Sequence, residues 1–263
     1  MPRRAATRYS APALEKGLDV VELLASQPHA LSLQEIARRL GRSSAELYRM
    51  LDVLVQRGWL ARLPDASYGL TLRLFELAHR HPPVGRLLDV AVPHMQELAR
   101  RTGQSNHLAV HHEARLVVLA RAEPPEPMSC LVRTGAHFAF HDDRVSARVI
   151  SAFQTGDQRA HYLQELLGGR RSAASRRSLD RRLEQIRARG YDEGPSDTVG
   201  GVVDVCFPLF DRFGAIAALD VVYLPQRDAK AGVPEVRKAL AETAVAISRA
   251  LGWIPVRRPR AAG

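Results

Sequence analysis

The sequence predicts an α+β protein with an N-terminal winged helix-turn-helix, a linker helix, and a C-terminal domain in which helices flank an antiparallel sheet. Three observations predict this fold class. Two capping-box sequences lie close together within residues 32–46, a strand-turn-strand pattern follows at 59–70, and from residue 107 onward β-type runs mix with amphipathic helices. A chain of 263 residues can bury a separate core in each of two domains.

The first predicted helix covers about residues 12–26. Pro12 is tolerated in its first turn, and apolar residues recur with helical spacing from Leu14 to Leu24. A basic, flexible arm of residues 1–11 precedes this helix. The basic side chains of the arm, which could follow DNA phosphates or could have no function, are Arg3, Arg4 and Arg8.

Two short capped helices come next, separated by a glycine turn. Ser32 is followed by Glu35, and Ser43 by Glu46, at the spacing with which both side chains satisfy backbone N–H groups at a helix start. Gly41 ends the first of these helices. This arrangement is typical of a helix-turn-helix, whose second helix lies in the major groove of double-stranded DNA.

The outer face of that second helix is the candidate DNA-reading surface. Arg49 could contact guanine or a phosphate, and the alternative for it is a solvated helix face. For Ser43 we favour helix capping alone. The hairpin at 59–70 would form a wing that contacts DNA or is plain surface. The predicted DNA-binding residues are Arg42, Ser43, Ser44, Tyr48 and Arg49, with Arg62 and Tyr68 in the wing.

A further helix is predicted over 72–81, and His81-Pro82-Pro83 breaks it. We predict a DNA-binding domain at 12–81, a linker helix at 84–103, a sensor domain at 104–256 and a tail at 257–263. In the sensor domain the expected strands lie at 107–110, 116–120, 128–132 and, as a hairpin, 206–223. The expected helices lie at 144–155, 157–167 and 176–189, with a final helix from Pro234 that ends at Gly252.

Composition excludes several classes of protein. The net charge is +10, yet residues 1–80 hold twelve Lys and Arg against eight Asp and Glu, so charge alone does not prove DNA binding. No apolar run reaches the roughly 18 residues of a membrane span, and Met1-Pro2-Arg3-Arg4 does not lead into the apolar region of a signal peptide, so we expect a cytoplasmic protein without membrane contact. Two distant cysteines offer neither a disulfide framework nor a zinc site, so we expect no metal and no cofactor.

An enzyme is the main rival class. The chain has no nucleophile elbow, phosphate-binding glycine loop or zinc-protease motif. An acid–base site built from His141, Asp204 and Asp220 would leave the capping boxes and the wing unexplained. His107 and His111 share one face of a strand, but a single strand supplies no third metal ligand. We therefore expect a protein that is not an enzyme.

Several segments match a family pattern in order and spacing: Leu33–Gly41, Leu54–Leu60, Arg187–Tyr191 and Phe207–Asp211. Through them the chain resembles the IclR family of bacterial transcription regulators over nearly its whole length. The resemblance implies a winged helix-turn-helix joined by a linker helix to a GAF-like effector-binding domain. It also implies a repressor or activator that assembles as a homodimer or tetramer, binds operator DNA and responds to a small molecule.

The resemblance also places a ligand pocket, where this sequence departs from the family. His141 is retained, but Asp204 stands near the position of a pocket Cys and Asp220 at that of a Ser. Two alternatives remain open: a preference for cationic or hydroxyl-rich ligands, or a degenerate, non-sensing pocket in which Arg144 or Arg148 pairs with these aspartates. The predicted effector-binding residues are Met128, Cys130, His141, Arg144, Val145, Asp204, Asp220 and Val222.

Overall fold

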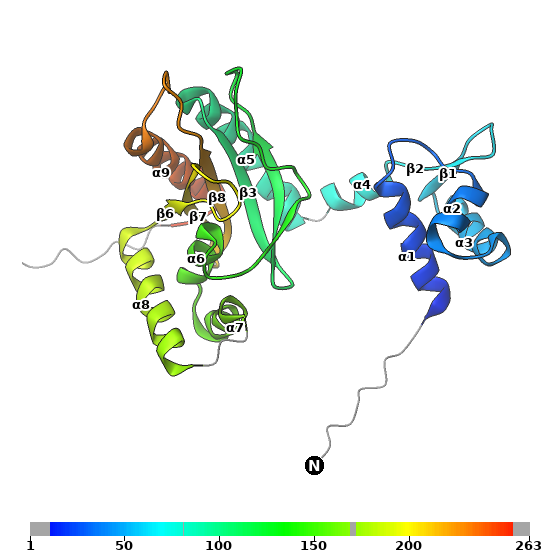
Figure 1. Cartoon of the computed structure of the whole chain (residues 1–263), viewed down its shortest axis with the longest axis horizontal. Helices are drawn as coiled ribbons and strands as arrows, with labels where there is room; N and C mark the ends of the chain where they lie inside the picture. Colours follow the sequence, from blue (N-terminus) through cyan, green and yellow to red (C-terminus); the bar gives the residue numbers. More distant parts are fainter. Residues whose placement is uncertain (1–10, 81, 169–171, 255–263) are drawn as a thin grey trace, which may run out of the picture. The chain divides into compact units, whose positions relative to one another are not determined.

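The computed structural model describes residues 11–80, 82–168 and 172–254. These residues fall into two compact units, one within Met1–Gly85 and the other within Arg86–Gly263 (Figure 1). The predicted basic arm, apart from Ala11, and the predicted tail 257–263 lie outside the described residues.

The first unit contains a helix-turn-helix followed by a hairpin. Its elements are α1 (Pro12–Ala25), α2 (Leu33–Leu40), α3 (Ser44–Gln56), β1 (Leu60–Arg62), β2 (Tyr68–Leu70) and α4 (Arg73–Arg80). Both capping boxes form as predicted. The hydroxyls of Ser32 and Ser43 each accept a bond from the backbone N–H three residues later, and each N3 glutamate accepts one in return. Gly41 ends α2 in the left-handed conformation, with φ of 63°.

The core of the first unit gathers apolar residues from the three helices and the hairpin. The fully buried side chains at its centre include Val20, Ile36, Leu47, Leu51 and Leu60. A backbone bridge between Leu31 and Tyr68 ties the hairpin to the helices. The Tyr68 side chain is only 5% exposed within this core, so the predicted DNA contact from Tyr68 is wrong because strand alternation turns it inward.

The second unit is built on a six-stranded antiparallel sheet in the order β5-β4-β3-β8-β7-β6. Its strands are β3 (Ser105–His112), β4 (Arg115–Ala122), β5 (His137–Ala139), β6 (Asp192–Pro195), β7 (Val203–Phe210) and β8 (Ala215–Tyr223). Its helices are α5 (Pro82–Thr102), α6 (Val145–Ala152), α7 (Gly156–Leu167), α8 (Ala173–Arg189) and α9 (Val233–Ala250).

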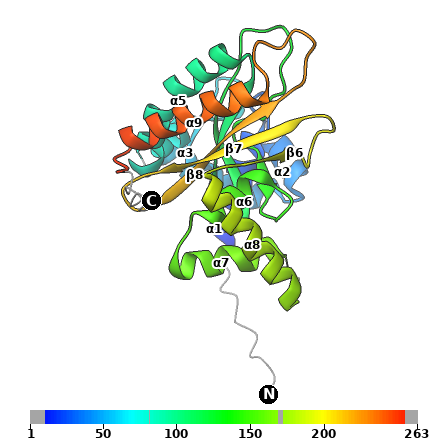
Figure 2. The same cartoon turned by 90° about the vertical axis from the view of Figure 1, so that its left-hand side faces the viewer.

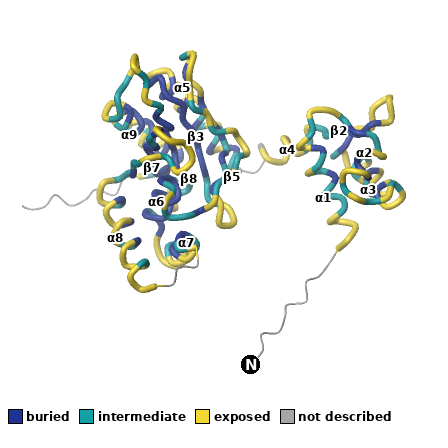
Figure 3. Tube along the Cα trace, viewed as in Figure 1, coloured by how far each residue is buried: buried dark blue, intermediate teal, exposed yellow. Residues whose placement is uncertain are grey.

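Helices cover both faces of this sheet. Leu108 and its neighbours on one face pack against α5 and α9, whereas Ala109 and its neighbours on the other face pack in the cluster formed by α6, α7 and α8 (Figure 2). The alternation of side chains along each strand produces the two cores. Buried segments accordingly follow the strands and the inner helix faces (Figure 3).

One predicted strand is wrong. Residues 128–132 form a loop, and β5 takes the place next to β4 instead. Pro124, Pro125 and Pro127 lie just before this segment, and proline cannot donate a backbone hydrogen bond to a strand ladder. The loop remains close to the sheet, where its residues help to enclose a cavity.

Among the described residues, no helix is both long enough and apolar enough to cross a bilayer.

Candidate nucleic-acid interface and ligand cavity

The outer face of α3 presents two large side chains to solvent. Tyr48 is 54% exposed and Arg49 is also exposed, while Leu47 and Leu51 on the opposite face are fully buried. Ser44 is half-buried at the start of the helix. The 3.6-residue period therefore separates a packed face from a free face that could enter a DNA groove.

Two ion pairs fix the start of α3 against α1. The Arg42 guanidinium lies 2.8 Å from the Asp19 carboxylate, and the Lys16 ammonium lies 2.9 Å from the Glu46 carboxylate. The bond from Lys16, followed by the bond from the Ser43 backbone, lowers the pKa of Glu46 to about 2. Arg42, a predicted DNA contact, is therefore already engaged within the unit.

The remaining predicted contacts of the first unit have different surroundings. Ser43 is exposed but is occupied as the N-cap of α3. Arg62 is exposed at the end of β1, beside the hairpin turn that Asp65 and Ser67 close with a hydrogen bond of 2.6 Å. Arg62 and the outer face of α3 are therefore both accessible to a polyanion such as DNA.

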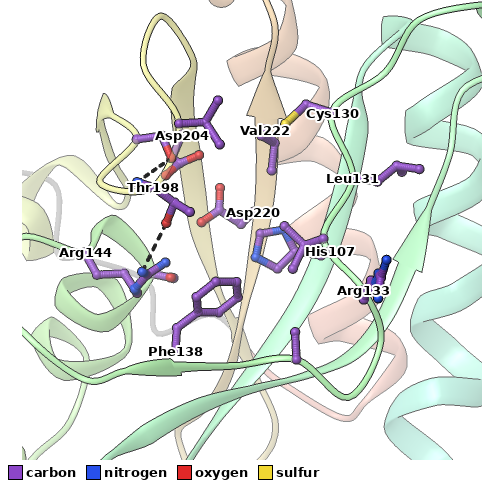
Figure 4. A pocket seen from close by; sticks show the side chains of 15 residues that line it. His107, Cys130, Leu131, Arg133, Phe138, Arg144, Thr198, Asp204, Asp220 and Val222 are labelled. Carbon is purple, nitrogen blue, oxygen red and sulfur yellow. Dashed lines mark hydrogen bonds between the residues drawn. The ribbon is translucent and has the colours of Figure 1, made fainter. Parts of the chain in front are cut away.

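The second unit contains a cavity of about 210 Å³ on the sheet face that carries α6 (Figure 4). Strands β3, β7 and β8 supply one wall, the 130–133 loop a second, and the start of α6 a third. The residues that line it are His107, Cys130, Leu131, Val132, Arg133, Ala136, Phe138, Arg144, Ser146, Ser196, Thr198, Val199, Asp204, Asp220 and Val222.

This cavity brings together five of the residues predicted for effector binding: Cys130, Arg144, Asp204, Asp220 and Val222. The other three have different positions. Met128 is 66% exposed on the loop, and Val145 is buried in the core formed by α6, α7 and α8. His141 lies outside the lining, with its Nε2 atom 3.3 Å from the Asp197 carboxylate.

Several lining residues were not predicted from the sequence, and His107 is the most important. It lies directly opposite Asp220 in the pairing of β3 with β8. The side-chain alternation of β3 indicated only which residues share a face with His107. Its neighbour on β8 depends on the strand register, and long-range pairing leaves no signal in a single sequence.

The two arginines near the cavity pair with aspartates other than those expected. Arg144 Nη2 lies 2.9 Å from Asp197 Oδ2, and Arg148 Nε lies 2.7 Å from Asp192 Oδ2. The predicted alternative, in which an arginine forms an ion pair with Asp204 or Asp220, is therefore wrong.

The two cavity aspartates are consequently buried without an ion-pair partner among the described residues, although Arg144 lies in the same cavity lining. Asp220 is 2% exposed, and its Oδ1 atom has no hydrogen-bond partner. Burial, reinforced by the charge of Asp204, raises the pKa of Asp220 well above its usual range. Burial also raises the pKa of Asp204, which is 8% exposed, although a hydrogen bond with Ser196 opposes the shift.

His107 lies in the same wall of the cavity, so that Asp204, Asp220 and His107 form a polar row. Burial, assisted by the positive charge of Arg144, lowers the pKa of His107 to about 4, so the imidazole is neutral near neutral pH. Its Nδ1 atom is buried and has no partner among the described residues. The cavity therefore contains a neutral imidazole and two carboxyl groups whose hydrogen-bonding capacity is not fully used within the described structure.

The buried Asp220 carboxyl predicts a pH-dependent stability. A carboxyl with a raised pKa holds its proton longer in the folded protein than in the unfolded chain, so the wild type loses stability as pH rises from the ordinary aspartate range. Asp220→Asn mimics the protonated form and should stabilise the protein by about 1–3 kcal/mol at mildly alkaline pH.

Thermal unfolding followed across pH tests this prediction. The advantage of Asp220→Asn should shrink as the pH falls, and Asp89→Asn on the exposed face of α5 serves as the matched control with no such trend. An advantage that is constant with pH would contradict an ionisable, buried Asp220.

No group of three or more potential metal ligands occurs among the described residues. His111 instead contacts the Glu165 carboxylate at 2.5 Å.

A helix-turn-helix with a hairpin wing, followed by a sheet domain that encloses a small polar cavity, is the arrangement expected of a two-domain transcription regulator that binds DNA and a small molecule. Comparison with known families agrees with this class. The IclR helix-turn-helix domain matches residues 13–64, and the C-terminal domain of the bacterial transcriptional regulator IclR matches residues 84–249. The chain belongs to the IclR family of bacterial transcription regulators.

Individual relatives agree with this assignment over most of their length. The chain is 30% identical, over 251 residues, to a glycerol operon regulatory protein of Streptomyces coelicolor, covering 91% of this chain and 96% of that protein. The crystal structure of IclR from Thermotoga maritima matches with a TM-score of 0.72 and 25% identity, covering 91% of this chain and 98% of that one. An IclR homolog from Microbacterium hydrocarbonoxydans, crystallised in complex with 4-hydroxybenzoate, matches with a TM-score of 0.73, 27% identity and the same coverage.

Proposed function

We propose that this regulator binds operator DNA through its first unit and that a small molecule in the Figure 4 cavity changes the affinity for that DNA. The observation that carries the proposal is the buried, partly unsatisfied polar row of the cavity, because such groups call for a partner. The related protein that binds 4-hydroxybenzoate supports a ligand-binding role for this domain.

On this proposal residues 12–81 form the DNA-binding domain, 84–103 the linker helix and 104–256 the sensor domain. Tyr48, Arg49 and Arg62 would contact double-stranded DNA, with Ser43 and Ser44 near the phosphates. A bacterial transcription regulator meets its operator in the cytoplasm, where we place this protein. It acts by binding and has no catalytic role.

A second copy of the chain would complete the DNA-binding surface, because two half-sites raise the affinity that one winged module provides. The first unit has an apolar groove lined by residues of α1, α3 and α4, including Leu14, Leu18, Val53 and Leu74. Leu14 is 63% exposed and Leu18 is 52% exposed, which is unusual for a leucine pair on one helix face. We therefore place a homodimer contact on this groove, with or without further assembly to a tetramer.

Leu18→Glu should convert the dimer into a monomer and weaken operator binding strongly, because it puts a charge into the apolar contact. Light scattering and gel-shift titration measure the two effects. Phe213→Glu, a change at an 81% exposed apolar residue of the second unit, is the matched control. A Leu18→Glu protein that remains a dimer would exclude this groove as the contact.

Footprinting of the region next to the gene tests the regulatory function itself. We expect a two-fold symmetric footprint whose half-sites are about one helical turn of DNA, or a small multiple, apart. Small molecules that shift operator affinity should lose their effect in Val222→Phe, which fills the cavity. A footprint without symmetry would contradict the dimer, and ligand effects that survive Val222→Phe would contradict the role of the cavity.

A further inference from the structure

We infer that the cavity binds a small ligand carrying a protonated amine, and that Asp204 and Asp220 hold its ammonium group. This inference rests on the proposed function and names the class of ligand that the sensor domain recognises. It concerns this chain specifically, because both aspartates depart from the neutral polar residues expected at these positions.

The geometry places the two carboxyl groups where one ligand group can reach both. In the pairing of β7 with β8, Cys206 is opposite Asp220 and Asp204 is opposite Val222. Asp204 and Asp220 are therefore diagonal neighbours on one face of the sheet, a relation that separates such residues by about 7–8 Å. Figure 4 shows Asp204, Asp220 and His107 in a row along this wall of the cavity.

Among the described residues no arginine or lysine forms an ion pair with either aspartate, although the positive charges of Arg144 and Arg148 act on both from a longer distance. Arg144 is bound to Asp197, and it also lies over the Phe138 ring, with 4.3 Å between the guanidinium carbon and the ring centroid. Arg148 is bound to Asp192 and is not part of the cavity lining. The other arginine of the lining, Arg133, is an exposed residue of the 130–133 loop. On the sheet wall an anionic ligand would therefore meet two carboxyl groups beside an arginine that is already paired.

A ligand ammonium would satisfy polar groups of the cavity that have no partner among the described residues. It donates up to three hydrogen bonds, which the unpartnered Asp220 Oδ1 and the Asp204 carboxylate can accept. Its charge also relieves the repulsion between the two carboxylates. The neutral His107 imidazole can accept a further hydrogen bond without adding positive charge.

This mode of binding is coupled to proton release. Burial and the charge of Asp204 raise the pKa of Asp220, and a bound cation would lower that pKa again. Binding near neutral pH should release protons, and affinity should increase as pH rises until the ligand amine itself loses its proton. The titratable and charged groups that act on Asp220 from the surrounding elements are His107, Arg144, Arg148, Asp197, Asp204 and Cys206, and the 130–133 loop adds Cys130 and Arg133 to the same cavity wall.

Calorimetry of the full chain with isosteric probes tests the inference. Benzylamine, benzoate and benzyl alcohol have nearly the same shape and differ in charge, as do butylamine, butyrate and butanol. We expect each amine to bind about tenfold or more tightly than its acid and its alcohol. Repeating the amine titration in phosphate and in HEPES buffer, which differ in ionisation enthalpy and contain no primary amine, should show net proton release.

Variants assign the effect to the two carboxyl groups. Asp220→Asn and Asp204→Asn should each remove the preference for amines, while Asp89→Asn on the surface of α5 should retain it. The unfolding temperature of each unliganded variant shows separately that it is folded.

Tighter binding of either acid, equal binding of the alcohol, or no heat and no thermal shift from either amine at millimolar concentration would overturn the inference. Each of these outcomes is independent of the footprint and of the Val222→Phe comparison, on which the proposed function stands or falls.

Discussion

Arg148→Met is expected to destabilise the second unit by about 3–5 kcal/mol, the usual cost of removing one partner of a buried ion pair. The Arg148 side chain is 2% exposed, and Arg148 Nε lies 2.7 Å from the Asp192 carboxylate. Its Nη1 atom also donates to the backbone oxygens of Asp142 and Asp143, at 2.9 Å and 2.6 Å. The substitution would therefore leave a nearly buried carboxylate and two carbonyl groups without this donor.

Denaturant unfolding of the full chain measures this effect. Arg181→Met on the exposed face of α8 removes the same charge and should change the free energy of unfolding very little. In the single variant the Asp192 carboxylate keeps only its bond from Arg189 Nη2, at 2.6 Å. The double variant Arg148→Met, Asp192→Leu should recover much of the loss, because it removes the buried carboxylate as well. A loss as small as that of Arg181→Met would show that Arg148 does not hold α6 to β6.

Local signals in the sequence were sufficient for most of the fold. The capping pairs Ser32 with Glu35 and Ser43 with Glu46 act within four residues, so their structural effect could be predicted from spacing alone. Strand alternation is equally local, and it correctly predicted that Asp204 and Cys206 lie on one face of β7. The family resemblance then located the cavity on that face.

The errors concern contacts between distant parts of the chain. Apolar character alone predicted a strand at 128–132, but the preceding prolines and the pairing of β5 with β4 exclude it. Tyr68 was predicted to contact DNA, but its side chain is buried in the core, and its backbone pairs with that of Leu31. The partners of Arg42, Arg144 and Arg148 lie 23, 53 and 44 residues away, and no periodicity specifies such pairs.

These pairings change the interpretation of the cavity. Arg144 is paired with Asp197 and Arg148 with Asp192, so Asp204 and Asp220 have no ion-pair partner among the described residues. A degenerate pocket would be expected to pair such carboxyls internally or replace them with apolar residues, because an unpaired buried carboxyl is costly. The presence of both carboxyl groups, with an unpartnered Asp220 oxygen, is the physical reason to expect a ligand there.

Arg49→Ala should weaken operator binding by about 1–3 kcal/mol for each half-site, with little effect on folding. Arg49 is exposed on the free face of α3, next to Tyr48, and the opposite face of that helix is anchored by Leu47 and Leu51. Loss of its guanidinium therefore removes a potential base or phosphate contact without disturbing the core. In a dimer the change occurs twice, so the total loss of affinity is correspondingly larger.

Gel-shift titration at fixed salt, against both the operator and unrelated DNA, distinguishes the two kinds of contact. A base contact by Arg49 predicts a loss for the operator that exceeds the loss for unrelated DNA, whereas a phosphate contact predicts equal losses and a weaker dependence on salt. Arg181→Ala removes the same charge from the second unit and should leave both affinities unchanged. Unchanged operator affinity of Arg49→Ala would exclude this side chain from DNA recognition and move the groove contact to Tyr48 or Ser44.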